Sequence, residues 1–136
     1  MGRSTHARRR ERGQELVEFA LILPRLLLLM VGIFEFGYVV FAYNTLSNAV
    51  REGARYGSVN PPVDQAAKDA IIVRASRLTT GLNQDEDVWT WDVDDSVSGR
   101  VSVSVEYEHT PFTGFIFAPL GLDTLPLRAA SSMGVE

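Results

Sequence analysis

The sequence predicts an α+β protein, in which a long N-terminal transmembrane helix precedes a small exported domain with one helix on a short antiparallel sheet. Three observations carry this prediction. Residues 17–43 are nearly all apolar, prolines at 61 and 62 interrupt the helical pattern, and a period of two appears after residue 87. The predicted divisions are a basic cytoplasmic leader at 1–13, a transmembrane helix with a helical extension at 14–58, and an acidic exported domain at 59–136.

Charge is distributed unevenly along the 136 residues, although the net charge is only −4. Residues 1–13 carry five arginines and one glutamate, about +4, whereas residues from 59 onward carry twelve acids and five bases, about −7. The absence of cysteine excludes disulfides, thiolate metal sites and a cysteine nucleophile. His6 and His109 are far apart and lack the spacing of a zinc site, so we expect neither a metal nor another cofactor.

The apolar run is long enough for a bilayer. It covers about 27 positions, whereas a helix needs roughly 20 to cross the hydrocarbon core. Because arginine clusters stay on the cytoplasmic side, the leader is expected inside and the C-terminal domain outside. The sequence therefore predicts a single-pass protein of the cytoplasmic membrane. The basic leader beside an apolar run favours this role over nucleic-acid binding.

A cleaved secretory signal is a competing interpretation. Such signals also begin with basic residues, but their apolar run usually has only 7–15 residues. The best position for a cut among small residues is near Ala49, after Ser47 and Asn48. That cut would release a soluble binding protein.

The junction between the leader and the apolar run contains a glycine, Gly13, followed five residues later by Glu18. An ionisable group within a membrane is costly and is a functional hypothesis by default. A cut after Gly13 would give Gln14 a free, charged amine. That amine could pair with Glu18 of a neighbouring subunit and fix the axial register of the two helices. Alternatively, Glu18 lies at the headgroup level and extends toward water.

Three separated blocks resemble the TadE-like minor pilins (pseudopilins) of Tad-type pilus systems. They are RGQELVEFALILP at residues 12–24, GIFEFG at 32–37 and AVREGARY at 49–56. The resemblance implies a prepilin that a prepilin peptidase cuts after Gly13, with Glu18 at the position used in processing and assembly. The sequence departs from the family at Arg25, which stands where an apolar residue is usual. Arg25 can extend to the cytoplasmic headgroups or pair with Glu18 or another subunit, and Glu35 is expected to face a protein partner.

The segment after the apolar run is expected to continue the helix. Ala49, Gly53 and Gly57 recur every four residues and form a smooth stripe on which another helix can pack closely. Arg51, Glu52 and Arg55 lie off this stripe and are expected to be surface or intersubunit charges.

The exported domain is expected to contain one helix and three strands. The helix is predicted at about 62–78, with one face formed by Val63, Ala67, Ala70, Ile71 and Leu78. Alternation predicts strands at 89–93, 101–107 and 125–135.

The Trp89 and Trp91 side chains are expected to pack on the helix, although a sugar or partner site is an alternative. Acidic residues 85–95 lack the order of a calcium loop and are read as a solvated surface. The apolar segment 111–120 either covers the sheet core or contacts another pilin.

The preferred hypothesis is a minor pilin acting in pilus assembly, initiation or adhesion. The expected partners are a prepilin peptidase, other pilin subunits, the Tad inner-membrane assembly machinery and the lipid bilayer, with the pilus as a second location. No nucleophile and base are positioned for hydrolysis, so an enzyme is not expected. The alternative is an uncleaved anchor that presents a binding domain in a secretion or envelope complex.

Overall fold

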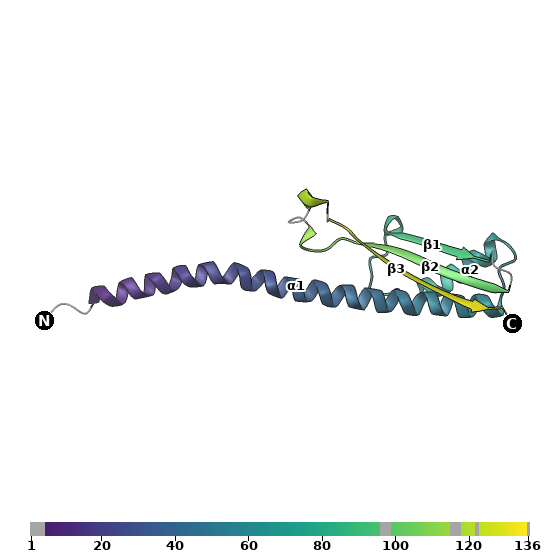
Figure 1. Ribbon diagram of the computed structural model, residues 1–136, viewed down its shortest axis with the longest axis horizontal. Coiled ribbons are helices and arrows are strands. Elements are labelled where there is room, and N and C mark those ends of the chain that lie inside the picture. Colours follow the sequence, from purple (N-terminus) through teal and green to yellow (C-terminus); the bar gives the residue numbers. More distant parts are fainter. Residues whose placement is uncertain (1–4, 96–98, 115–117, 122, 136) are drawn as a thin grey trace. The chain divides into compact units, whose positions relative to one another are not determined.

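The structure is a computed structural model that describes residues 5–95, 99–114, 118–121 and 123–135. Its helices and strands are α1 (Thr5–Val59), α2 (Gln65–Ser76), β1 (Trp89–Asp94), β2 (Arg100–His109) and β3 (Leu125–Gly134), with short 3-10 turns η1 (Glu86–Val88) and η2 (Ala118–Leu120). Figure 1 shows this order along the chain. The predicted α+β fold is confirmed: a long apolar helix, a second helix and three antiparallel strands.

The chain forms two compact units, Met1–Phe36 and Gly37–Glu136, and α1 runs through both. Some sequence-based expectations lie outside the described residues. They concern the arginines of the leader before Gly13, whose side chains are not described, the turn at 96–98, and the apolar residues 115–117.

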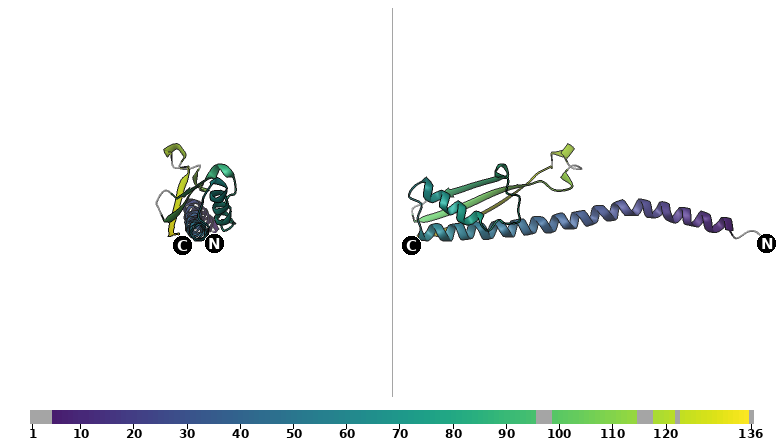
Figure 2. Two further views of the ribbon diagram at one scale, coloured as in Figure 1. Left: turned by 90° about the vertical axis from the view of Figure 1, so that its right-hand side faces the viewer. Right: turned by 180° about the vertical axis from the view of Figure 1, so that it is seen from behind.

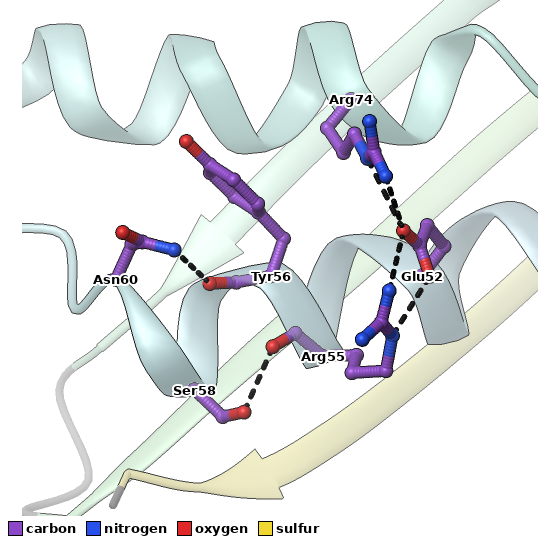
Figure 3. A network of polar contacts seen from close by, with 6 residues as sticks. All are labelled: Glu52, Arg55, Tyr56, Ser58, Asn60 and Arg74. Atoms are coloured by element: carbon purple, nitrogen blue, oxygen red, sulfur yellow. Dashed lines mark hydrogen bonds and ion pairs between the residues drawn. The ribbon is translucent and has the colours of Figure 1, made fainter.

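Two prolines end α1. The residue before a proline avoids the α-helical region, so the helix stops at Val59, ahead of Asn60 and Pro61. The last turn is closed locally: the Asn60 backbone N–H and side-chain amide both donate to the Tyr56 carbonyl, at 3.0 and 3.2 Å, as the close-up in Figure 3 shows for the side chain. The predicted helical extension through residue 57 is therefore present.

The second helix is shorter than predicted. It begins at Gln65 instead of 62 because Asp64, in an extended conformation, caps it: its carboxylate accepts a 2.8 Å hydrogen bond from the Ala67 N–H. It ends at Ser76, two residues before the predicted end.

The predicted face of this helix is largely wrong. Of its five predicted members only Ile71 is fully buried, and the other buried residue of α2 is Ala75. Val63 precedes the helix and is 89% exposed, and Leu78 follows it and is 46% exposed. Ala70 is also exposed, and Ala67 is half-buried. Val63 and Leu78 fail because they lie outside α2, and within the helix the buried face follows the four-residue spacing of Ala67, Ile71 and Ala75.

The sheet has the order β1-β2-β3, and both pairs are antiparallel. Trp91 faces Val105, which in turn faces Ala129, so the alternating residues of the three strands share one face. That face is fully buried at the centre: Val101, Val103, Val105 and Tyr107 of β2 are at most 2% exposed. The two views in Figure 2 show α2 and the C-terminal part of α1 on the same side of the sheet.

The last part of α1 completes this core. Ala42, Leu46, Val50 and Ala54 recur every four residues, and all are at most 1% exposed. This spacing places them on one helical face, which packs with the β2 residues and Ile71 in one apolar cluster. Helix α1 is thus the central buried helix of the C-terminal unit, in addition to forming the N-terminal unit.

Candidate functional site

The predicted processing site lies within α1. Gly13, Gln14 and Glu18 are all helical and exposed. Gly13 does not have a positive φ, and a Cβ added there would meet no described atom within 4 Å. Glycine inside a helix costs about 1 kcal/mol relative to alanine. Neither the backbone nor the packing of this chain therefore requires glycine at position 13.

Large apolar side chains surround α1 beyond this point. Leu21, Leu29, Ile33 and Phe34 are 61–71% exposed, although they point in different directions around the helix. A helix that is apolar on all sides needs an apolar solvent or partner helices. By length and composition, the stretch Gly13–Val59 is a helix able to cross a membrane.

The ionisable residues in this stretch differ in their surroundings. Glu18 and Arg25 are both exposed, and among the described residues no ion pair joins them. Glu35 is half-buried. Among the residues whose side chains the structure describes, Glu18 and Arg25 therefore do not pair with each other.

The small-residue stripe is occupied by other parts of the same unit. Ala49, Gly53 and Gly57 are buried. A Cβ on Gly53 would lie 3.1 Å from the Ala75 Cβ, and one on Gly57 would lie 2.9 Å from a methyl group of Val101. The absence of side chains lets α2 and β2 approach α1 closely.

Charged residues beside the stripe join the two helices. Figure 3 shows the side chains of Arg55 and Arg74 converging on Glu52. The Glu52 carboxylate accepts hydrogen bonds from Arg55 at 2.9 and 3.0 Å and from Arg74 at 3.1 Å. These bonds, that of Arg55 first, lower the pKa of Glu52 below its ordinary value. Glu52 thus links α1 to α2 through Arg74, and Arg55 is a neighbouring surface charge on α1.

One contact was not anticipated from the sequence. The Tyr38 hydroxyl lies 3.3 Å from the Tyr107 hydroxyl, which also accepts a 3.4 Å hydrogen bond from the Asn83 N–H. The Tyr38 ring lies against that of His109 with the ring centroids 4.6 Å apart and the planes tilted by 32°, and the Trp89 and Tyr107 ring centroids are also 4.6 Å apart. Aromatic residues from α1, β1 and β2 therefore meet at one end of the sheet. The tyrosine that directly follows the GIFEFG block was the available signal.

The two tryptophans pack against the core, as expected, but remain partly accessible. Trp89 and Trp91 are stacked with centroids 5.9 Å apart, and the Trp89 indole donates a 2.7 Å hydrogen bond to the Asn83 carbonyl. In the acidic region, Asp95 pairs with Lys68 at 2.8 Å. No group of three or more histidine, aspartate or glutamate side chains in the described residues is arranged to hold a metal.

Comparison with known proteins gives one match. The model of a family described as TadE-like protein matches residues 13–55. Neither the curated proteins nor the solved structures contain a match. The matched segment begins at Gly13 and includes Glu18, the apolar stretch and the first part of the buried helix.

Proposed function

We propose that this chain is a minor pilin of a Tad-type pilus, on the premise that residues 13–55 match the model of the TadE-like protein family. In this proposal a prepilin peptidase cuts the chain after Gly13, the helix holds the subunit in the cytoplasmic membrane, and the C-terminal unit is exported. The subunit then joins other pilin subunits through α1, with the help of the Tad inner-membrane machinery.

The observation that carries the proposal is the unexplained glycine. Gly13 weakens the helix in which it lies and contacts no described residue that would exclude a side chain. A peptidase that accepts only the smallest residue before the cut provides a reason for glycine that the fold does not.

Assembly through α1 has separate support. The apolar side chains of residues 16–36 lie on all sides of the helix, and apart from the half-buried Leu23 the large ones are exposed in the single chain. Lipid covers them before assembly and neighbouring helices cover them afterwards. Glu18, one turn from the new N-terminus, is close enough along the helix to receive the Gln14 amine of a neighbour displaced along the axis. Such pairing in a low dielectric would offset the cost of burying both charges.

The competing interpretation of a secreted protein is disfavoured by the position of Ala49. Ala49 is 0% exposed and lies within the buried part of α1. A cut there would remove Ala42 and Leu46 from the core that they share with β2. An uncleaved anchor that presents a binding domain leaves the core intact, so it remains the alternative.

The test is the mature N-terminus of the full-length protein, determined by intact-mass and peptide mass spectrometry with and without the prepilin peptidase. The expected mature chain starts at Gln14 only when the peptidase is present. Gly13→Leu should keep the leader, whereas Gly32→Leu should be processed normally. Gly32 is the matched control because it is also a helical glycine with no described atom within 4 Å of an added Cβ. A leader retained in the wild-type chain with active peptidase would favour the uncleaved anchor.

A further inference from the structure

Two opposite charges lie within the apolar part of α1. Glu18 and Arg25 are the only ionisable residues between positions 16 and 34, and both side chains are exposed. The ion pairs among the described residues include neither of them. A charge within a membrane is costly unless it meets an opposite charge. A partner of opposite charge would lower this cost for both residues.

Lipid headgroups are a poor partner for Arg25. Counted from Val17, the first residue of the apolar run, Arg25 lies about 12 Å, or about two turns, along the helix. Arginine reaches the headgroups from positions near helix ends, whereas this depth approaches the middle of a hydrocarbon core about 30 Å thick. Pro24 removes the hydrogen bond to the Ala20 carbonyl, but Ala20 lies about 140° around the helix from Arg25 and offers it no acceptor.

Sequence spacing places the two charges on one face of α1, here called the charged face. Glu18 and Arg25 are about 20° apart around the helix and about 10 Å apart along it. Ile22 and Leu29 lie on the same face and are 51% and 61% exposed. Both charged side chains lean toward the N-terminus of the helix, so they do not converge within one chain.

We propose that Arg25 pairs with Glu18 of a second copy of this chain, whose α1 lies parallel and is displaced along the axis by about seven residues, or roughly 10 Å. This displacement brings the guanidinium and the carboxylate to one level, where Ile22 and Leu29 of the two charged faces exclude water. A second copy is the occupant because it carries both charges at complementary positions, so no net charge is buried. The contact is heterologous, and it therefore repeats from copy to copy without closing.

The inference rests on assembly through α1 in the proposed function, but not on the cut after Gly13. The Gln14 amine reaches Glu18 from a neighbour displaced by about four residues in the opposite direction, so the two contacts involve different neighbours. A carboxylate has two oxygens and can accept hydrogen bonds from both. Arg25 thus adds a second contact that sets the register of the helices.

The absence of cysteine allows paired thiols to test this register. Ile22→Cys with Leu29→Cys places two thiols seven residues apart on the charged face. Ala20→Cys with Leu27→Cys has the same spacing on the opposite face and is the matched control. A disulfide cannot join two thiols of one helix at this spacing, because their Cα atoms are about 10 Å apart. Each full-length double variant is expressed with the pilus machinery and oxidised in membranes with copper phenanthroline.

The expected result is a ladder of disulfide-linked multimers from the double variant of the charged face and little from the control. Adding Arg25→Leu should lower the yield of multimers at least about tenfold, because Glu18 of the neighbour loses its partner. Arg25→Lys keeps the charge and should retain most of the yield. Leucine is apolar and preserves the membrane span, so a loss in Arg25→Leu reports on the charge.

Equal yields with arginine and leucine at position 25 would overturn the inference and assign Arg25 to the headgroups. Equal yields from the two double variants, no multimers, or cross-links only to a protein of another mass would overturn it too. The mature N-terminus is measured by mass spectrometry on the same membranes. A retained leader together with Arg25-dependent multimers would contradict the proposed cut and support the pairing of Arg25 with Glu18.

Discussion

Glu18 carries the assembly hypothesis at the scale of single residues. Glu18 and Glu15 are both exposed glutamates of the first turns after Gly13. The proposed function gives the role in processing and assembly to Glu18 and not to Glu15, and of the two only Glu18 lies within the apolar run. A carboxylate that pairs with a neighbour's Gln14 amine cannot be replaced by an uncharged residue without leaving that amine unpaired.

We therefore expect Glu18→Ala to reduce processing or the number of assembled pili strongly, and Glu15→Ala to leave both near the wild-type level. Pilus number is counted by electron microscopy, and processing is followed by mass spectrometry. Unchanged processing together with unchanged pilus number in Glu18→Ala would contradict the role given to Glu18.

Gly57 shows how tightly α1 is packed. An alanine Cβ would lie 2.9 Å from a Val101 methyl group and 3.0 Å from the Ile71 terminal methyl group. Overpacking costs about 1–3 kcal/mol, partly offset by about 1 kcal/mol of helix propensity. Because both contacts are 3.0 Å or shorter, the cost should lie in the upper part of this range, so we expect Gly57→Ala to lower the free energy of unfolding by up to about 2 kcal/mol.

The measurement for Gly57→Ala is thermal or denaturant unfolding in detergent, followed by near-UV circular dichroism of the tryptophans. Gly37→Ala is the control because an added Cβ there meets no described atom within 4 Å. An unchanged midpoint for Gly57→Ala would show that α2 or β2 can shift without cost.

At the scale of elements, the ion pairs of Glu52 link α1 and α2. Its pKa is lowered in the folded protein, chiefly by the hydrogen bond from Arg55. A carboxyl group with a lowered folded pKa stabilises the fold above its unfolded pKa, near 4.3, and loses this contribution as pH falls through the folded value. Arg74 provides the contact between the two helices.

The free energy of unfolding of the wild type should therefore fall between neutral pH and pH below about 4, as Glu52 becomes protonated. In Glu52→Gln this decrease should be smaller. The measurement is denaturant unfolding of the full-length chain as a function of pH. Glu108→Gln, on the exposed face of β2, is the control and should keep the wild-type profile. The same pH profile in Glu52→Gln and wild type would mean that the ion pairs contribute nothing to stability.

The strands could be predicted from sequence, but the limits and the face of α2 could not. Residues 101–107 alternate between valine or tyrosine and polar residues, and this period of two predicts a half-buried strand and not a helix. For α2, the prolines at 61 and 62 suggested the start, whereas the capping carboxylate of Asp64 determines it. Aspartate immediately before a helical pattern was the signal that could have corrected the boundary.

At the scale of the whole molecule, the dual role of α1 was hidden in the sequence. Ala42 lies at the end of the apolar run, and Leu46, Val50 and Ala54 resemble its continuation, yet these four residues belong to the core of the C-terminal unit. Their four-residue spacing is compatible with either role, because the sequence alone does not say which solvent covers that face. The processing site and the assembly role of Glu18 cannot be read from one folded chain, since both depend on other molecules.

The division at residue 59 can be tested with two truncated proteins. A chain that starts at residue 59 lacks the four core residues of α1, whereas one that starts at Gly37 retains the whole compact unit. We expect the longer chain to give dispersed amide NMR signals and a cooperative transition, and the shorter chain to lack both. If the chain from residue 59 folded cooperatively, residues 59–136 would be an independent domain that does not need α1 for its core.

The shared helix also has a consequence for the timing of export. If the C-terminal unit is exported as proposed, the apolar face formed by residues 42–54 crosses the membrane before β2, whose buried residues begin at Val101. Ile71 and Ala75 of α2 can cover part of this face early, but its β2 partners follow only about 50 residues later, so the complete core waits for the late strands. In that proposal the apolar face of α1 is incompletely covered for an interval during export, and the adjacent lipid surface or an exported chaperone is expected to shield it until the sheet has formed.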